Sequence, residues 1–287
     1  MDLKSLIDDP SKLPTISKLG RQLIASFSSE DVSVTEIGHQ LAADPVLSVK
    51  LLKLANSAYF QVSRTIGTVD AALQMLGLVM VRNLVLGSSM AGAFRSTTGI
   101  DLPQFWRYNL YTACVARWLA QRTEVNADRA FTLALLHAVG QLQMHVIMPQ
   151  AMAPLDQQMN VLAPGRAQLE QQIFGFNYGD VSAELAWAWK LPLPLTEALR
   201  HIAQPLAAPE FLEAAALVHL GAWRARAEVL GWSDAEQLAS YPAEVAERLN
   251  LQPTWAPALA ARAHQDRSQP MMPPLGELSD GLEALFE

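Results

Sequence analysis

Helix start and stop signals recur along almost the whole chain, and no segment alternates polar and apolar residues for long enough to form a half-buried strand. Ser33, with Glu36 three residues later, has the form of a capping box. Asp44 before Pro45 supplies an N-cap followed by proline at the first helical position. Gly77 is placed to end a helix. The sequence therefore predicts an all-α protein.

The best internal boundary is the stretch Arg95–Ile100, which is rich in small polar residues and precedes a helix restart at Asp101. On either side of it we expect one helical lobe. Residues 1–98 form the N-terminal lobe, and residues 99–265 form a second lobe with the C-terminal helices. The Pro- and Met-containing residues 266–287 are predicted to be a mobile tail.

Residues 133–141, Leu-Ala-Leu-Leu-His-Ala-Val-Gly-Gln, form the most specific motif of the second lobe. They resemble the signature of the HD superfamily of metal-dependent phosphohydrolases, in which an aspartate directly follows the histidine and a lysine often follows later. In this chain Ala138 stands at the aspartate position and Gln141 at the lysine position. The resemblance also implies an earlier and a later histidine ligand, which fall at Tyr108 and Tyr178.

Phenols and a methyl group are poor ligands for hard divalent cations, which need several oxygen or imidazole ligands. The resemblance therefore implies a degenerate HD core without a metal, and we expect no cofactor and no enzymatic activity. His145 does not replace the lost ligands, because it lies about 12 Å further along a helix at 1.5 Å per residue. We interpret His137 as a core histidine that bonds a neighbour such as Gln141 or Tyr108.

Further motifs follow one another in the N-terminal lobe: Leu13-Pro14, Asp44-Pro45, residues 51–57 (Leu-Leu-Lys-Leu-Ala-Asn-Ser), Leu76-Gly77 and residues 81–85 (Val-Arg-Asn-Leu-Val). With the second lobe they are similar to the HDOD family over residues 10–210. The resemblance implies an all-helical, non-catalytic protein of bacterial signalling. It also implies a two-component or cyclic-dinucleotide pathway as the context.

Composition narrows the classes of partner. A net charge of −7 and a pI near 5.4 argue against broad binding to nucleic acid, which depends on clustered Lys and Arg. We find no run of about 18 uncharged apolar residues, so no membrane span is predicted. The first ten residues lack the apolar centre of a signal peptide. With one cysteine, Cys114, which we expect to be a buried inert thiol, the sequence predicts a cytoplasmic protein.

Four basic residues of the N-terminal lobe form a candidate interaction face: Lys50, Lys53, Arg64 and Arg82. Lys50 and Lys53 are three residues apart and are therefore neighbours on one side of a helix. The functional interpretation is a surface for an acidic partner or a phosphate. The alternative is an ordinary solvated helix face, and Arg82 can equally pair with an acid between helices.

The second candidate site is the former active-site pocket, formed by Tyr108, His137, Ala138, Gln141 and Tyr178. A degenerate enzyme can keep such a pocket, so a small ligand can bind there. Three hypotheses follow. The leading one is a non-catalytic signalling protein that acts through protein–protein contacts. The alternatives are a phosphohydrolase with an altered metal-ligand set and a small-molecule sensor that uses the former pocket.

Overall fold

The computed structural model describes residues 3, 13–14, 18–25, 33–60, 62–260 and 271–286. Within these ranges all regular elements are helices and none is a strand, which confirms the all-α prediction.

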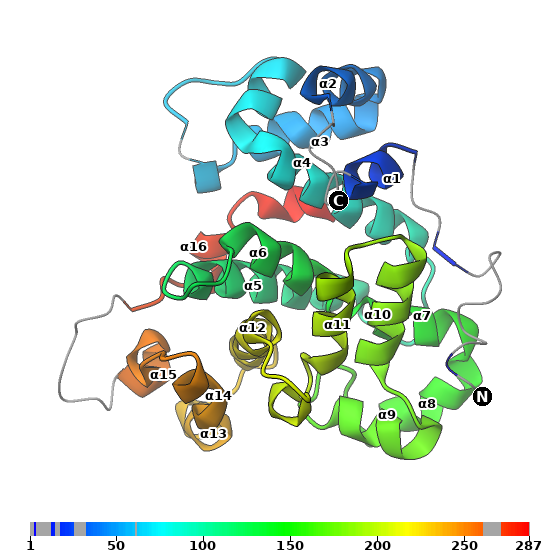
Figure 1. Cartoon of the computed structure of the whole chain (residues 1–287), viewed down its shortest axis with the longest axis vertical. Helices are drawn as coiled ribbons and strands as arrows, with labels where there is room; N and C mark the ends of the chain where they lie inside the picture. Colours follow the sequence, from blue (N-terminus) through cyan, green and yellow to red (C-terminus); the bar gives the residue numbers. More distant parts are fainter. Residues whose placement is uncertain are drawn as a thin grey trace.

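The N-terminal part of the chain forms α1 (Lys18–Ala25), α2 (Val34–Ala43), α3 (Pro45–Ala55), the 3-10 helix η3 (Ala58–Phe60) and α4 (Val69–Ala93). The central part forms α5 (Leu102–Ala120), α6 (Ala127–Leu136), α7 (Val139–Ile147), α8 (Pro149–Gln158), α9 (Arg166–Phe174), α10 (Tyr178–Ala188) and α11 (Leu193–His201). The last part forms η4 (Pro205–Ala207), α12 (Glu213–Val229), α13 (Asp234–Ser240), α14 (Ala243–Arg248), η5 (Pro253–Trp255), α15 (Pro257–Ala260), α16 (Leu275–Ser279) and η6 (Leu282–Leu285). Figure 1 places α1–α4 at one end, α5, α6 and α12 across the middle, and α7–α11 beside them.

Side-chain caps begin several helices where the sequence predicts them. The Asp44 carboxylate accepts from the backbone N–H groups of Val46 and Leu47. The Ser33 hydroxyl accepts from the N–H of Glu36 at 3.2 Å. Such caps satisfy backbone donors that have no partner inside the helix. The local sequence therefore determines where these helices begin.

Gly77 interrupts α4, as the sequence predicts. Its φ of 73° and ψ of 162° are non-helical, and positive φ favours glycine because it has no Cβ. The chain resumes a helix at once, so α4 consists of two helical pieces joined by a kink. The second piece carries most of the buried residues of α4, including Arg82 and Asn83.

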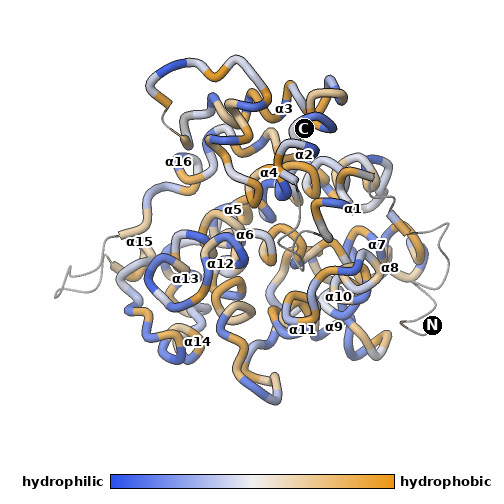
Figure 2. The backbone as a smooth tube through the Cα atoms, turned by 45° about the horizontal axis from the view of Figure 1, so that its top comes forward, coloured by the Kyte–Doolittle hydropathy of each residue, from blue (hydrophilic) through white to orange (hydrophobic). Residues whose placement is uncertain are grey.

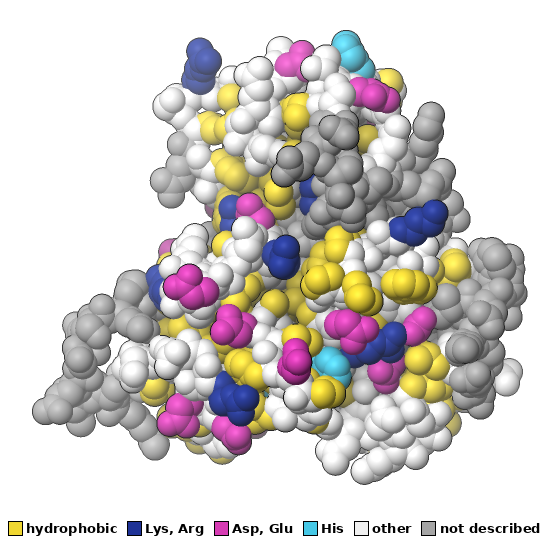
Figure 3. Space-filling model, viewed as in Figure 1, with side chains coloured by type: hydrophobic (Ala, Val, Ile, Leu, Met, Phe, Trp, Pro, Cys, Tyr) yellow, Lys and Arg dark blue, Asp and Glu magenta, His cyan; other side chains and the backbone are white. Residues whose placement is uncertain are grey.

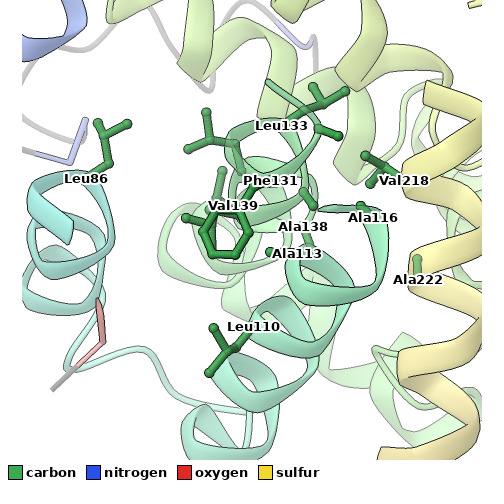
Figure 4. Close-up of a cluster of buried hydrophobic side chains, with 14 of the residues drawn as sticks. Leu86, Leu110, Ala113, Ala116, Phe131, Leu133, Ala138, Val139, Val218 and Ala222 are labelled. Atoms are coloured by element: carbon green, nitrogen blue, oxygen red, sulfur yellow. The ribbon is translucent and has the colours of Figure 1, made fainter. Parts of the chain in front are cut away.

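The middle of the molecule is built by close packing of α5, α6 and α12 (Figure 4). Gly221 of α12 makes this possible, because a methyl group there would lie 2.8 Å from the carbonyl oxygen of Thr112 on α5. The buried hydrophobic cluster continues from α1 to η6 without a division. The helices on either side of residues 95–100 therefore share one core.

Two stretches are long and apolar enough to cross a membrane by length and composition: Val69–Ala93 and Ala127–Ile147. In Figure 2, α4 is one of the more hydrophobic parts of the backbone. However, 89% of the apolar window in Ala127–Ile147 and 56% of that in Val69–Ala93 is buried inside the fold. Their apolar character is accounted for by packing in the protein core.

Residues 271–286, which we call the C-terminal segment, contradict the mobile tail predicted for 266–287. Four of its side chains are at most 2% exposed: Met272, Leu275, Leu282 and Leu285. The helix α16 packs on α5, and η6 packs against α3 and α4 (Figure 1). The prediction followed the Pro-rich composition and gave too little weight to these spaced apolar residues, whose burial stabilises the docked segment. Residues 266–270 lie outside the described ranges.

Gly87→Ala should loosen the C-terminal segment, because the added methyl group would lie 2.6 Å from the carbonyl oxygen of Leu285. We expect faster hydrogen–deuterium exchange in residues 275–286 and a lower melting temperature. Gly92→Ala is the matched control, since it lies on the same helix with nothing within 4 Å. That variant should keep or gain stability, by up to about 1 kcal/mol. Unchanged exchange in Gly87→Ala would contradict the docking contact.

Candidate functional site

His137 lies at the junction between α6 and α7. Its Nδ1 is 2.5 Å from the carbonyl oxygen of Ala134, and its Nε2 is 3.0 Å from the hydroxyl of Tyr108. Because a carbonyl oxygen only accepts, these partners assign the proton to Nδ1 and make the Tyr108 hydroxyl the donor to Nε2. The histidine thus bonds Tyr108, one of the two neighbours named from the sequence, while Gln141 bonds elsewhere.

The environment of His137 favours a neutral imidazole. His137 is 0% exposed and Tyr108 is 2% exposed. Burial lowers the pKa of His137 to about 3, and the charge of Arg226 acts in the same direction. At neutral pH both ring nitrogens are therefore engaged, one by the Ala134 carbonyl and one by the phenol.

Arg226 is the main component of this site that the sequence interpretation missed. It reaches in from α12 with only 8% exposure, and its guanidinium carbon lies 5.5 Å from the centre of the Tyr108 ring. Its positive charge also acts on the hydroxyl of Tyr178 and favours the phenolate there. Among the described residues it makes no ion pair, and its Nε has no hydrogen-bond partner. A buried cation therefore stands beside both phenols.

The charge of Arg226 acts on several neighbours. Burial raises the pKa of Tyr108 and of Tyr178, and Arg226 opposes that rise by favouring the phenolate. Burial also lowers the pKa of His219 to about 4, with Arg226 as the second cause. The site consequently combines neutral rings with one permanent positive charge.

Gln141 belongs to a polar network next to the site. Its amide nitrogen donates to Glu170 Oε1 at 2.5 Å, and Arg166 Nε donates to the same oxygen at 2.8 Å. The other oxygen of Glu170 accepts from the backbone N–H of Tyr178 at 2.8 Å. Burial raises the pKa of Glu170, and these donors oppose the rise. Gln141 and Tyr178 are thus joined through one buried carboxylate.

The network continues to the surface through Asp156. Arg166 lies 2.8 Å from Asp156 Oδ1, and His145 Nε2 lies 3.0 Å from Asp156 Oδ2. His145 Nδ1 faces the carbonyl oxygen of Gln141 at 2.7 Å. Both ring nitrogens of His145 are therefore engaged in this network.

A close helix contact fixes the site from the other side. A methyl group on Gly140 would lie 2.1 Å from the carbonyl oxygen of Tyr178. The N–H of Gly140 donates to the hydroxyl of Ser182, which donates to the carbonyl oxygen of His137 at 3.1 Å. Glycine at 140 thus brings α7 against α10 and sets the position of Tyr178.

The predicted pocket residues come together but leave little access. Ala138 is 3% exposed, Gln141 1% and Tyr178 6%. Three clefts on the surface of the described chain are lined by other residues. Ala138 contributes only a methyl group, and in the described part of the chain no three His, Cys, Asp or Glu side chains group as metal ligands. This arrangement is a packed junction of helices.

The predicted interaction face is divided in the structure. Lys50 Nζ donates to the hydroxyl of Ser88 at 2.9 Å and lines one cleft, whereas Arg82 is 6% exposed and lines another. Burial lowers the pKa of Arg82 to about 10, and Asp128 opposes this. Lys53 and Arg64 are exposed. The four residues therefore do not form one continuous face.

Asn56 and Cys114 can also be placed in the structure. The side-chain oxygen of Asn56 accepts from the backbone N–H of Ile66, and its amide nitrogen donates to the carbonyl oxygens of Leu52 and Ile66. These bonds tie the loop after α3 to the end of that helix. Cys114 is buried, and burial raises its thiol pKa far above the ordinary value. Both residues have structural roles.

The face in Figure 3 mixes acidic and basic side chains without a broad basic area.

Acidification should destabilise the fold through His137. Below pH 6.5 the unfolded chain protonates this histidine, whereas the folded chain does so only near pH 3. Stability is therefore fully present above pH 6.5 and is lost as the pH falls toward 3, by about 1.4 kcal/mol per pH unit. Urea unfolding between pH 7 and pH 4 measures how the free energy of unfolding changes with pH. In His137→Gln this change should be smaller.

His39→Gln, at an exposed position, controls for removal of a histidine as such. If the free energy of unfolding depends on pH equally in the wild type and in His137→Gln, the buried neutral imidazole is refuted. This holds even if His137→Gln is less stable than the wild type at pH 7.

Comparison with known proteins adds the family context. A model of the HDOD domain matches residues 13–205 of this chain. An uncharacterized protein from Treponema pallidum (strain Nichols) is 29% identical over 197 residues, or 68% of this chain. The match spans only 37% of that relative's length.

Solved structures give the same picture of the fold. A protein from Shewanella amazonensis SB2B, named "putative phosphohydrolase", has a TM-score of 0.69 and 25% identity, covering 86% of this chain and 88% of its own. A "putative signal transduction protein" from Marinobacter aquaeolei VT8 has a TM-score of 0.67 and 20% identity. That match covers 84% of this chain and 54% of the other, and it is a likeness of fold alone.

Proposed function

Since this chain belongs to the HDOD domain family, we propose that it is a cytoplasmic signal-transduction protein that acts by binding another protein and catalyses no reaction. The supporting observation is the junction of Tyr108, His137, Tyr178 and Arg226, in which aromatic rings and a guanidinium are packed together. The name of the Marinobacter structure is consistent with signalling.

Within this proposal the second lobe is a degenerate HD-type core. Catalysis by a metal-dependent phosphohydrolase needs a cation that polarises the phosphate or activates water. Tyr108 and Tyr178 offer neutral phenols, and the His137 lone pair at Nε2 already accepts from Tyr108. These groups support recognition and packing, and they leave no set of ligands for a hard cation.

The charge of Arg226 adds an electrostatic reason why a metal ion should not bind at this junction. Two unit charges about 5 Å apart repel by roughly 3 kcal/mol at an effective dielectric constant of 20, and a divalent ion by about twice that. Arg226 already supplies a positive charge beside both phenols. A metal entering the site would have to overcome this repulsion, and the nearby carboxylate of Glu170 is already engaged by Gln141, Arg166 and Tyr178. No contact in the described chain favours the phosphohydrolase alternative.

Purified protein supplied with Mn²⁺ or Fe²⁺ should release no product above the blank from bis(p-nitrophenyl) phosphate, nucleoside triphosphates or cyclic dinucleotides. The physical reason is the missing ligand set around His137. His137→Ala should give the same blank rate. Hydrolysis by the wild type that is abolished in a folded His137→Ala variant would sink the non-catalytic proposal.

The proposed docking surface is the α3 face, consisting of Val46, Val49 and Lys53. These residues recur at helical spacing, and the two valines are 63% and 55% exposed. Arg64 lies in the exposed loop that Asn56 ties to the end of α3. An apolar strip with one cation on the same helix and a second in the loop after it suits a protein partner with an apolar contact and an acidic rim.

Lys53→Glu/Arg64→Glu should remove the partner that tagged wild-type protein captures from its host's lysate, because each reversal replaces attraction with repulsion. The retained proteins are compared by quantitative mass spectrometry. Arg129→Glu is the matched control, since Arg129 is exposed but lies on α6 beside a different cleft. Equal capture by the wild type and the double variant would rule out the α3 face.

A further inference from the structure

A cleft of about 490 Å³ lies where α3, α4, α5 and η6 meet; we call it the α3–α5 cleft. Its walls include Lys50 of α3, Ser88 of α4, Trp106 and Arg107 of α5, and Phe286 just after η6. This size falls within the range of small-molecule sites, roughly 300–1,000 Å³. The cleft is separate from the buried His137 junction and was not identified from the sequence, although Lys50 was.

Cations dominate the charged lining of this cleft. Among the described residues that line it, Lys50, Arg95 and Arg107 stand against the single carboxylate of Glu283. Arg95 and Arg107 make no ion pair with any carboxylate in the described ranges. The first turn of α5 also lines the cleft, but the Asp101 carboxylate caps that helix end, so the excess of positive charge comes from the three side chains. In a chain of net charge −7, this local excess of positive charge favours an anion.

The same cleft offers an aromatic surface. The rings of Trp106 and Phe286 stack with centroids 4.7 Å apart and an angle of 19° between their planes. Both side chains are only partly buried. Phe286 fills one face of Trp106, so a planar ligand group would pack on the part of the two rings that remains open to the cleft. Tyr111 lines the cleft as well, and Arg107 lies near enough to oppose the rise in its pKa that burial causes.

The other two clefts lack this combination. In the second, Arg82 and Arg129 face three carboxylates, from Glu124, Asp128 and Glu213. The third is largely apolar and contains a glutamate but no arginine or lysine. Only the α3–α5 cleft, among these three, joins an excess of cations to an aromatic stack.

We propose that the α3–α5 cleft binds a nucleotide-class ligand, with a planar ring against Trp106 and Phe286 and a phosphate held by Lys50, Arg95 and Arg107. Arginine and lysine bind phosphate oxygens through charge-assisted hydrogen bonds. The ligand would touch the N-terminal helices, α5 and the C-terminal segment at once. Its binding therefore tightens the C-terminal segment against the fold. The inference does not depend on the proposed protein partner.

Isothermal titration of the full chain with the four nucleoside 5′-monophosphates tests this directly, with guanosine and inorganic phosphate as the two halves of one probe. We expect at least one monophosphate to bind at least ten-fold more tightly than guanosine or inorganic phosphate does. Arg107→Gln should weaken that binding about ten-fold, because it removes one charge-assisted contact. Exchange in residues 275–286 should slow when the nucleotide is bound.

Lys50→Gln and Lys53→Gln provide the matched pair, since both lie on α3 and lose one charge, but only Lys50 lines the cleft. Lys50→Gln should weaken binding and Lys53→Gln should not. The proposal is overturned if no monophosphate binds below about 1 mM. It is also overturned if both lysine variants weaken binding equally, or if phosphate alone binds as tightly as the nucleotide.

Discussion

The hydrogen bond from the Tyr108 hydroxyl to His137 Nε2 keeps a neutral imidazole at the centre of the fold. Protonating that ring would place a second positive charge near Arg226 in a region closed to water, and the Tyr108 hydroxyl would have to turn from donor to acceptor. The neutral state is therefore a condition for the packing of α5, α6 and α12. Within the HDOD scaffold of this chain, the same condition makes His137 a packing residue.

Glycines decide how closely the helices around this bond approach. Gly221 brings α12 against α5, which carries Arg226 toward Tyr108, and Gly140 brings α7 against α10, which places Tyr178. Glu170 then joins the Tyr178 backbone to Gln141 and Arg166. The side chains of this junction thus converge on hydrogen bonds and one buried guanidinium. The clefts that remain open lie between other helices.

Much of the fold could be predicted from the sequence because its signals are local. Capping residues such as Asp44 and the positive φ of Gly77 set helix ends within a few residues. The pairing of His137 with Tyr108 was also within reach, through the family motif. Arg226 was not, because it lies beyond the residues that the motifs cover, and an arginine in an Ala-rich helix gives no sign of the face that it occupies. The docking of residues 271–286 depends on long-range contacts that composition does not record.

The most direct test of the central claim is a crystal soaked in Mn²⁺, with data collected at a wavelength where manganese scatters anomalously. The account predicts no anomalous peak among Tyr108, His137 and Tyr178, and continuous density for the Arg226 guanidinium against the Tyr178 side chain. A manganese peak at full occupancy between these three residues, with Arg226 displaced, would contradict it.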